Sequence, residues 1–396
     1  MSQRLISRSP DLRRLRDEGY EIEIRGNHLV IKNVPYVNAR REVLRGTLIS
    51  ELSLAGDVTI PPATHVAMFS GEEPCNQDGR AITQITHSSS VAQIDRELFA
   101  QRSFSAKPTS GRYEDYYDKM TTYVAILSGP AQVIDPQATA KTFPVIAEAA
   151  EDSVFHYMDT ASSRAGIGVA TQKLELGKVA IVGLGGTGSY VLDQVAKTPV
   201  KEIHLFDGDK FSQHNAFRSP GAPSTDELKA QPLKVNYLHG VYSKMHRHII
   251  PHGYYVDLSN VEELRGMNFV FLCLDRGESK RALVEKLEEF GVPFVDVGMG
   301  LYLAKGSVYG VLRVTTSTPE MRDHVRQKNR IPFSDGGDDP YSSNIQVADL
   351  NALNASLAVV RWKKLFGFYG DLEREHFATY TLDGNTLVNE DRPGPA

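Results

Sequence analysis

A run of glycines follows a short apolar segment and opens a stretch with helical spacing. The glycines are Gly183, Gly185, Gly186 and Gly188. Residues 178–182 before them read as a β-strand, and glycine allows both a tight turn and close approach of the backbone to a ligand. The first turn of a helix offers free N–H groups to phosphate. Asp207 closes the next strand at nearly the spacing of about 20 residues expected for a ribose ligand, so the sequence predicts a nucleotide site.

The polar residues beyond Asp207 favour ATP over a dinucleotide. Asp209 follows at once, and then come Asn215, Arg218 and Lys234. A dinucleotide enzyme has no need of these groups at the ribose end of its site. An ATP enzyme does, because arginine binds phosphate oxygens bidentately and lysine supplies a point charge. We therefore expect Gly183 to Gly188, the two aspartates and Asn215 to bind ATP, and Arg218 and Lys234 to act on its phosphates.

Asp275 is the expected magnesium ligand. It follows the apolar strand predicted at residues 269–274, and magnesium binds through one or two carboxylates together with phosphate oxygens. The chain has only two cysteines, Cys75 and Cys273. A disulfide framework and a zinc site of paired CxxC motifs are therefore not expected.

These elements occur in an order that resembles the ThiF/MoeB/HesA family of adenylyltransferases, whose fold is shared by the ubiquitin-activating enzymes. The family order is a glycine-rich turn, an acidic strand end, Asn-x-x-Arg, Lys, and Asp after an apolar strand. The resemblance covers roughly residues 155–365. It implies that Arg164, on a helix ahead of the first strand, reaches the ATP of a partner subunit in a homodimer. Lys229 is an alternative to Lys234, although the helical pattern that follows Lys234 favours the latter.

The resemblance also implies the reaction. The enzyme would use ATP and magnesium to adenylate the C-terminal carboxylate of a ubiquitin-like protein. Attack of the carboxylate on the α-phosphate gives an acyl-adenylate and pyrophosphate, and no side-chain base is required. Catalysis is then positioning and neutralisation of charge, which we assign to Arg164, Arg218, Lys234 and magnesium on Asp275.

Many relatives pass the acyl group to a cysteine in the loop before the last helix. Here that loop, residues 318–345, contains no cysteine, and alignment on the last helix places Ser334 near the usual position. Ser342 and Ser343 are alternatives, as is Cys75, which lies in a polar turn and is expected to be exposed. Transfer that stops at the adenylate is a further alternative. Cys273 is expected to be buried packing within its strand.

Two domains are expected to carry these features. Residues 1–150 read as a β-rich accessory domain, with a hairpin around Gly26-Asn27 and an amphipathic helix over 112–127. A linker is expected over 128–144. Residues 151–396 read as the adenylation domain, because strands alternate there with helices of the right length for a mostly parallel, Rossmann-like sheet. The expected helix at 162–176 precedes the first strand, and the last helix covers 350–365.

Composition restricts the partners. A net charge of −5, a pI near 6.2 and no basic stripe argue against nucleic acid or an anionic membrane surface. No apolar run is long enough to span a bilayer. A cytoplasmic enzyme is expected, with a ubiquitin-like protein and a conjugating-enzyme-like protein as partners, as in bacterial modification systems. The alternatives are a small-substrate or tRNA-modifying adenylase of the same fold and a non-catalytic scaffold.

Overall fold

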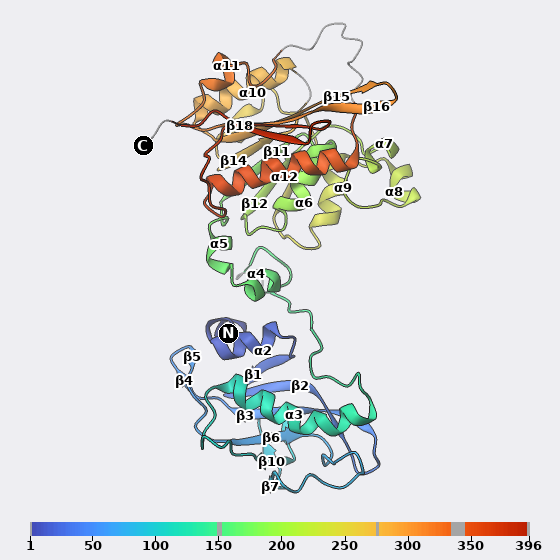
Figure 1. The fold of residues 1–396 in the computed structure, drawn as a ribbon, viewed down its shortest axis with the longest axis vertical. Coiled ribbons are helices and arrows are strands. Elements are labelled where there is room, and N and C mark those ends of the chain that lie inside the picture. The colour runs from blue at the N-terminus through green and yellow to red at the C-terminus, as the bar shows by residue number, and fades with distance from the viewer. Residues whose placement is uncertain (1, 149–152, 275–276, 334–344, 394–396) are drawn as a thin grey trace. The chain divides into compact units, whose positions relative to one another are not determined.

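The computed structural model of the 396-residue chain describes residues 2–148, 153–274, 277–333 and 345–393. The chain forms two compact units, Met1–Ile146 and Ala147–Ala396, here called the N-terminal unit and the C-terminal unit (Figure 1). No helix among the described residues is both long enough and apolar enough to cross a membrane.

The N-terminal unit is built on an antiparallel sheet of six strands. Their order across the sheet is β1-β2-β3-β6-β10-β7. The strands are β1 (Ile22–Arg25), β2 (His28–Val37), β3 (Val43–Glu51), β6 (Val66–Ser70), β7 (Thr86–Ser88) and β10 (Arg102–Ser105). Two short hairpins add β4 (Leu54–Ala55), β5 (Val58–Thr59), β8 (Ala92–Gln93) and β9 (Phe99–Ala100), and the helices are α1 (Ser2–Arg8), α2 (Pro10–Asp17) and α3 (Tyr116–Ile134). The predicted hairpin is confirmed, because Gly26 and Asn27 both have positive φ and join β1 to β2.

Helix α3 packs the apolar side of the N-terminal unit. Asp115 caps it by accepting a hydrogen bond from the N–H of Asp118 at 2.7 Å. Its apolar face lies in the core, with Tyr116, Met120, Tyr123 and Leu127 all fully buried. The helix continues through Pro130, so the first part of the segment predicted as a linker is helical. A proline removes one backbone hydrogen bond, and the burial of Ala131 holds the last turns against the unit.

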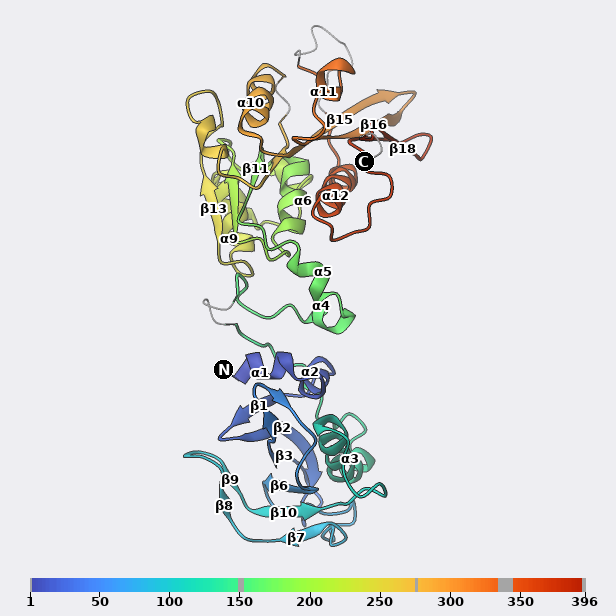
Figure 2. The same cartoon turned by 90° about the vertical axis from the view of Figure 1, so that its left-hand side faces the viewer.

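The C-terminal unit has the expected Rossmann-like architecture. Its sheet of eight strands has the order β13-β12-β11-β14-β15-β16-β17-β18, in which the first five run parallel and the last three extend the sheet antiparallel. The strands are β11 (Lys178–Val182), β12 (Glu202–Phe206), β13 (Ile249–His252), β14 (Phe269–Leu272), β15 (Phe294–Ala304), β16 (Ser307–Ser317), β17 (Phe377–Thr381) and β18 (Thr386–Glu390). Strands β15 and β16 form a long hairpin that continues beyond the parallel strands (Figure 2).

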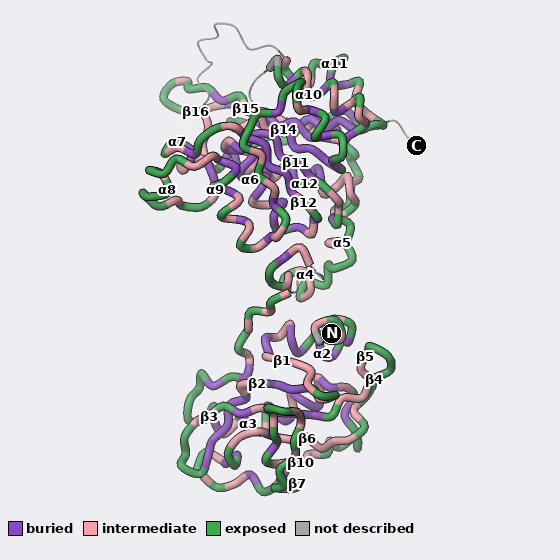
Figure 3. Tube along the Cα trace, turned by 180° about the vertical axis from the view of Figure 1, so that it is seen from behind, coloured by how far each residue is buried: buried purple, intermediate pink, exposed green. Residues whose placement is uncertain are grey.

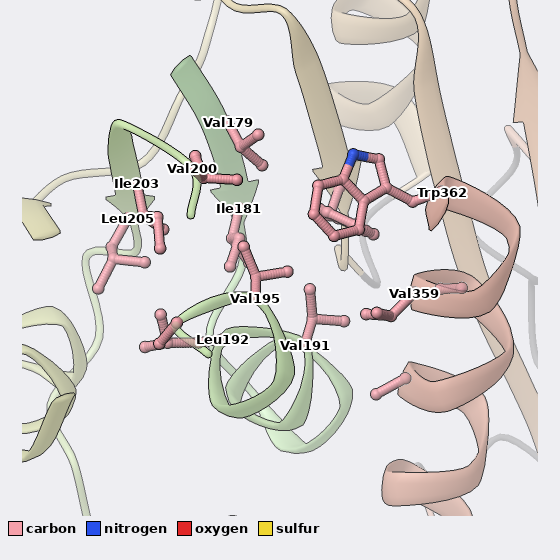
Figure 4. Packing of buried hydrophobic residues seen from close by; sticks show 14 of the residues in the cluster. Val179, Ile181, Val191, Leu192, Val195, Val200, Ile203, Leu205, Val359 and Trp362 are labelled. Atoms are coloured by element: carbon pink, nitrogen blue, oxygen red, sulfur yellow. The ribbon is translucent and has the colours of Figure 1, made fainter. Parts of the chain in front are cut away.

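Helices cover both faces of this sheet. The helices of this unit are α4 (Thr160–Ala165), α5 (Gly168–Gln172), α6 (Gly186–Val195), α7 (Gln213–Ala216), α8 (Thr225–Ala230), α9 (Lys234–Tyr242), η1 (Val261–Leu264), α10 (Gly277–Phe290), α11 (His324–Gln327) and α12 (Ala348–Leu365). Apolar residues of α6, α9 and α12 pack on one face, where Trp362 lies beside Phe269 and Phe271. Figure 4 shows Val191 and Val195 of α6 packed between the sheet and Val359 of α12. Residues of α10, α11 and η1 pack on the other. The central strands are buried on both sides (Figure 3), as parallel strands require.

The helix predicted over 162–176 is two short helices. Gly166, with φ +69°, ends α4, and α5 begins at Gly168. Glycine readily takes the left-handed conformation that terminates a helix, and two glycines so close together break the apolar spacing. Neither α4 nor α5 has a buried residue, and Ile167 and Val169 are exposed.

Candidate functional site

The glycine-rich turn lies at the carboxyl end of β11 and runs directly into α6. Gly183 has φ +91°, a conformation that glycine accepts without strain. A Cβ on Gly188 would overlap the carbonyl oxygen of Gly183, and one on Gly186 would overlap the Asn351 side chain of α12. The turn is therefore folded tightly, with the free N–H groups of the first turn of α6 at its end.

Asp207 fixes the turn from the neighbouring strand. It is buried, and its Oδ2 accepts a hydrogen bond from the N–H of Leu184 at 2.7 Å, while Oδ1 accepts one from the N–H of Asp209 at 2.8 Å. The predicted ribose ligand thus also shapes the glycine turn. That second role was not predicted from sequence spacing.

Lys234 lies beside these two aspartates. Its Nζ is 2.7 Å from Asp209 Oδ2 and 3.6 Å from Asp207 Oδ2, and the side chain is almost fully buried at the start of α9. The Tyr255 hydroxyl donates a hydrogen bond to the other oxygen of Asp209. Sequence reasoning did not identify Tyr255, because no motif marks it. The alternative, Lys229, lies on α8 with its side chain 73% exposed and pairs with Asp226.

Arg218 and Asn215 differ in how they face the site. Arg218 lines the same cavity as Lys234, and its Nε is buried with no hydrogen-bond acceptor among the described residues. A buried guanidinium N–H in a cavity needs an acceptor, which a phosphate oxygen supplies. Asn215 is 2% exposed, and its Oδ1 accepts from the N–H of Ser212 at 2.8 Å, so it caps α7. Its contact with ATP stays a prediction.

Two adjoining cavities meet at the glycine turn. The smaller, about 180 Å³, is lined by Asp207, Asp209, Arg218 and Lys234, and we call it the nucleotide cavity. The larger, about 560 Å³, extends along β15 and β16, and we call it the strand cavity. Both are lined by Gly185, Cys273, Leu274 and Gln346. A group held in one cavity is therefore next to a group held in the other.

The strand cavity contains polar groups that sequence reasoning missed. Lys280 from α10 and Arg313 from β16 line it, and both pair with the fully buried Asp296 of β15. The carboxamide of Asn354, on α12, donates to the carbonyl oxygen of Gly298 at 3.1 Å. Its Oδ1 is buried, and no described residue donates to it. The one sequence signal was Asp296 itself, an acid inside an apolar strand.

Both cysteines differ from expectation. Cys75, expected to be exposed, is 1% exposed, because its backbone bridges to Val37 and Ala81. Burial, and next the nearby Glu73 carboxylate, raise the pKa of its thiol, which disfavours the reactive thiolate. Cys273, expected to be buried, is half-buried just beyond the end of β14 and lines both cavities.

The remaining predicted site residues fall elsewhere. Arg164 lies on α4 with an exposed side chain and lines neither cavity. Asp275, Ser334, Ser342 and Ser343 lie outside the described residues. Among the residues that are described, no cluster of three or more His, Cys, Asp or Glu side chains could hold a metal ion. The assignment of magnesium to Asp275 therefore stays a prediction.

Solved structures with similar folds include the crystal structure of PaaA, at 19% identity and a TM-score of 0.45, covering 56% of this chain and 75% of that one. Escherichia coli MccB with ATP aligns at 15% identity and a TM-score of 0.43, covering 59% of this chain and 70% of MccB. The microcin C7 biosynthetic enzyme MccB with N-formylated MccA aligns at 16% identity and a TM-score of 0.46, covering 59% and 69%. No curated protein sequence matches the chain.

Family models match both units. Residues 10–160 match a domain of unknown function, DUF6791. Residues 160–360 match the model of the ThiF family; they hold the glycine turn, the lining of the nucleotide cavity, all of the strand cavity's lining except Thr379, and most of α12. That match covers more than half of the chain. One cavity is lined by the glycine turn, the acidic strand end and the buried lysine that the family order includes. The chain therefore belongs to the ThiF family of ATP-dependent adenylyltransferases.

Proposed function

We propose that the C-terminal unit adenylates the C-terminal carboxylate of a ubiquitin-like protein. The observation that carries this proposal is the pairing of the two cavities across the glycine turn. One cavity has the charges for a triphosphate, and the other is a channel along two extended strands. An enzyme that joins a nucleotide to a chain terminus needs these two spaces side by side.

The chemistry uses groups that are already in place. A carboxylate oxygen of the substrate attacks the α-phosphorus of ATP, the bond from that phosphorus to the bridging oxygen breaks, and pyrophosphate leaves with the electron pair. Arg218 and Lys234 would neutralise the charge that develops on the phosphates, and the N–H groups at the start of α6 would bind the α-phosphate. Magnesium, for which Asp275 is the proposed ligand, adds further neutralisation of the phosphates.

A peptide terminus is favoured over a small carboxylic acid by the polar lining of the strand cavity. The buried Asn354 Oδ1 is an acceptor with no donor among the described residues, and a backbone N–H of an extended peptide would supply one. Gly300 of β15 leaves open space above the strand, because a Cβ there would meet no atom within 4 Å. An extended, small-residue tail would fit over it.

This function is tested by ATP–pyrophosphate exchange. The purified chain, ATP, magnesium and labelled pyrophosphate should give labelled ATP only when the correct ubiquitin-like protein is added. Removal of the last residue of that protein should abolish exchange, because the attacking carboxylate is then displaced by one residue. Exchange that is equally fast without any protein, or with the truncated protein, would contradict the proposal.

We also propose that the enzyme is a homodimer in which Arg164 acts on the partner's ATP. Support comes from α4 and α5, which bury no residue in their own unit and expose Ile167 and Val169. A second copy of the chain would cover these side chains. A conjugating-enzyme-like protein is the proposed recipient of the activated acyl group.

Mixing two inactive variants tests the homodimer. Arg164→Ala and Asp275→Ala are each expected to be inactive alone. After subunit exchange the mixture should recover about a quarter of the wild-type rate, since half of the dimers are hybrids and each hybrid has one complete site. Subunit exchange is followed with a fluorescent label. Hybrids that form without any recovered activity would show that Arg164 does not act across the interface.

A further inference from the structure

Three charged side chains form a cluster at the wall of the strand cavity. Asp296 is fully buried; its Oδ1 lies 2.8 Å from Lys280 Nζ, and its Oδ2 accepts a hydrogen bond from Arg313 Nη2 at 2.7 Å. Arg313 also donates to Thr315 Oγ1 and to the carbonyl oxygen of Arg330. Two cations share one anion, so the cluster carries a net charge of about +1.

The excess charge faces the cavity. Of the described residues that line the strand cavity, Lys280 and Arg313 are the only charged ones. An uncompensated charge out of water is unfavourable, and a bound anion relieves it. The Lys280–Asp296–Arg313 cluster therefore has the electrostatics of an anion site.

The cluster lies where an extended chain over β15 would reach it. Gly298 pairs with Arg313 across the β15–β16 ladder, and a Cβ on Gly298 would overlap the guanidinium. The arginine therefore lies over the bare backbone of Gly298. Gly300, two residues further along the same face, is open above. A peptide that runs over Gly300 toward the glycine turn would meet Arg313 and then Lys280.

A nucleotide phosphate is not the anion proposed for this site, because the cations assigned to the phosphates line the other cavity. Arg218 and Lys234 line the nucleotide cavity and are absent from the lining of the strand cavity, as far as the described residues go. We propose that Lys280 and Arg313, held in place by Asp296, bind a carboxylate within the last two residues of the substrate peptide. This inference rests on the proposed function and adds the chemical character of the substrate's terminus.

The carboxylate has two sources. It is either the terminal carboxylate, held before it is activated, or an acidic side chain on the residue before it. In the first case the cluster acts on every substrate alike. In the second it selects peptides with Asp or Glu at the penultimate position.

A random-terminus peptide library distinguishes the two sources. Peptides that differ in their last two residues are incubated with the full chain, ATP, magnesium and hydroxylamine. Hydroxylamine attacks the acyl-adenylate and releases AMP, which leaves a C-terminal hydroxamate that mass spectrometry identifies. The variants are Arg313→Gln, Lys280→Gln and a double variant, Asp296→Asn with Arg313→Gln. The double variant removes the arginine and the buried carboxylate together, so that no buried acid loses its partner, and the amide side chains can still form hydrogen bonds. Lys286→Gln is the matched control, since Lys286 is on the same helix and pairs with Glu289 outside the cavity.

The cluster variants should lose affinity for the peptide and keep their affinity for ATP. The KM for peptide should rise by about tenfold to a hundredfold in the variants, as for loss of a hydrogen bond to a charged group. The KM for ATP in the exchange reaction should not change, and the Lys286→Gln enzyme should match the wild type in both. Lys280→Arg should recover most of the lost affinity, because it restores the charge.

Four outcomes are informative. Enrichment of Asp or Glu at the penultimate position, lost in Arg313→Gln, supports the side-chain source. A raised KM for all peptides without enrichment supports the terminal carboxylate. Wild-type KM values in all cluster variants with no acidic enrichment would overturn the inference and leave the proposed function standing. Absence of hydroxamate from every peptide and from every ubiquitin-like protein tested with the wild-type enzyme would contradict the proposed function, and the inference with it.

Discussion

Replacement of Lys234 by methionine is expected to lower the rate of ATP–pyrophosphate exchange by about a hundredfold to a thousandfold. Methionine keeps most of the buried aliphatic volume and removes the ammonium group. The phosphates then lose a point charge in a cavity shielded from water, and Asp207 and Asp209 lose the cation between them. Stopped-time exchange assays measure the rate, and thermal unfolding shows whether the variant is folded.

Lys229→Met is the matched control for this experiment. Lys229 is five positions earlier in the chain, exposed, and paired only with the exposed Asp226 among the described ion pairs. Surface pairs of this kind contribute about 1 kcal/mol or less, so the rate should stay within about twofold of the wild type. If Lys229→Met lost exchange and Lys234→Met kept it, the assignment of the phosphate-binding lysine would be reversed.

Gly188→Ala is expected to destabilise the C-terminal unit by about 3 kcal/mol or more. The new Cβ would overlap the carbonyl oxygen of Gly183, which is a backbone atom of the same turn. Relief of that overlap must shift the turn, which would disturb the hydrogen bond from the N–H of Leu184 to Asp207 Oδ2 that holds the turn in place. Chemical denaturation monitored by tryptophan fluorescence measures the change, because the single Trp362 is in the core of this unit.

Gly185→Ala, in the same turn, is expected to weaken ATP binding without lowering the stability of the fold. Its φ of −68° suits alanine, and a Cβ there would meet no protein atom within 4 Å. The fold should therefore keep its stability. Because Gly185 lines both cavities, the added methyl group should still weaken ATP binding by about tenfold, which calorimetry measures. Equal stability of the Gly188→Ala and Gly185→Ala proteins would contradict this account of the turn.

The local sequence pattern was sufficient to predict many of the strands and helices of the C-terminal unit. Strand β11 and helix α12 were predicted close to their observed bounds, and β12 ends just before Asp207 and α6 begins at the glycine turn, as expected, because apolar runs and glycines mark them. Strand β15 runs from Phe294 to Ala304, and its full length is hard to read from the sequence because Gly298 and Gly300 interrupt its apolar pattern. The glycines that hide this strand from the sequence are the ones that open the strand cavity.

Tertiary contacts explain what sequence reasoning missed. Lys280, Asp296 and Arg313 come from α10, β15 and β16, and the fold alone brings them together. Cys75 lies in a polar stretch that reads as exposed, yet its strand-like bridges bury it. Composition describes the neighbours of a residue along the chain, whereas burial depends on neighbours in space. The prediction for Cys75 was wrong for this reason, whereas Cys273 does pack against the core but is only half-buried, because β14 ends one residue before it.

The shared wall between the two cavities has a consequence for inhibitor design. Gly185, Cys273, Leu274 and Gln346 border both spaces, so two ligands would lie in contact there. One molecule that joins an adenosine to a short peptide through a non-hydrolysable linkage would occupy both at once. Its second half would bind at high effective concentration, so its affinity would exceed that of either half alone. The peptide half would also make the inhibitor selective for this enzyme, because it would contact the charged side chains of the strand cavity, which the adenosine half does not reach.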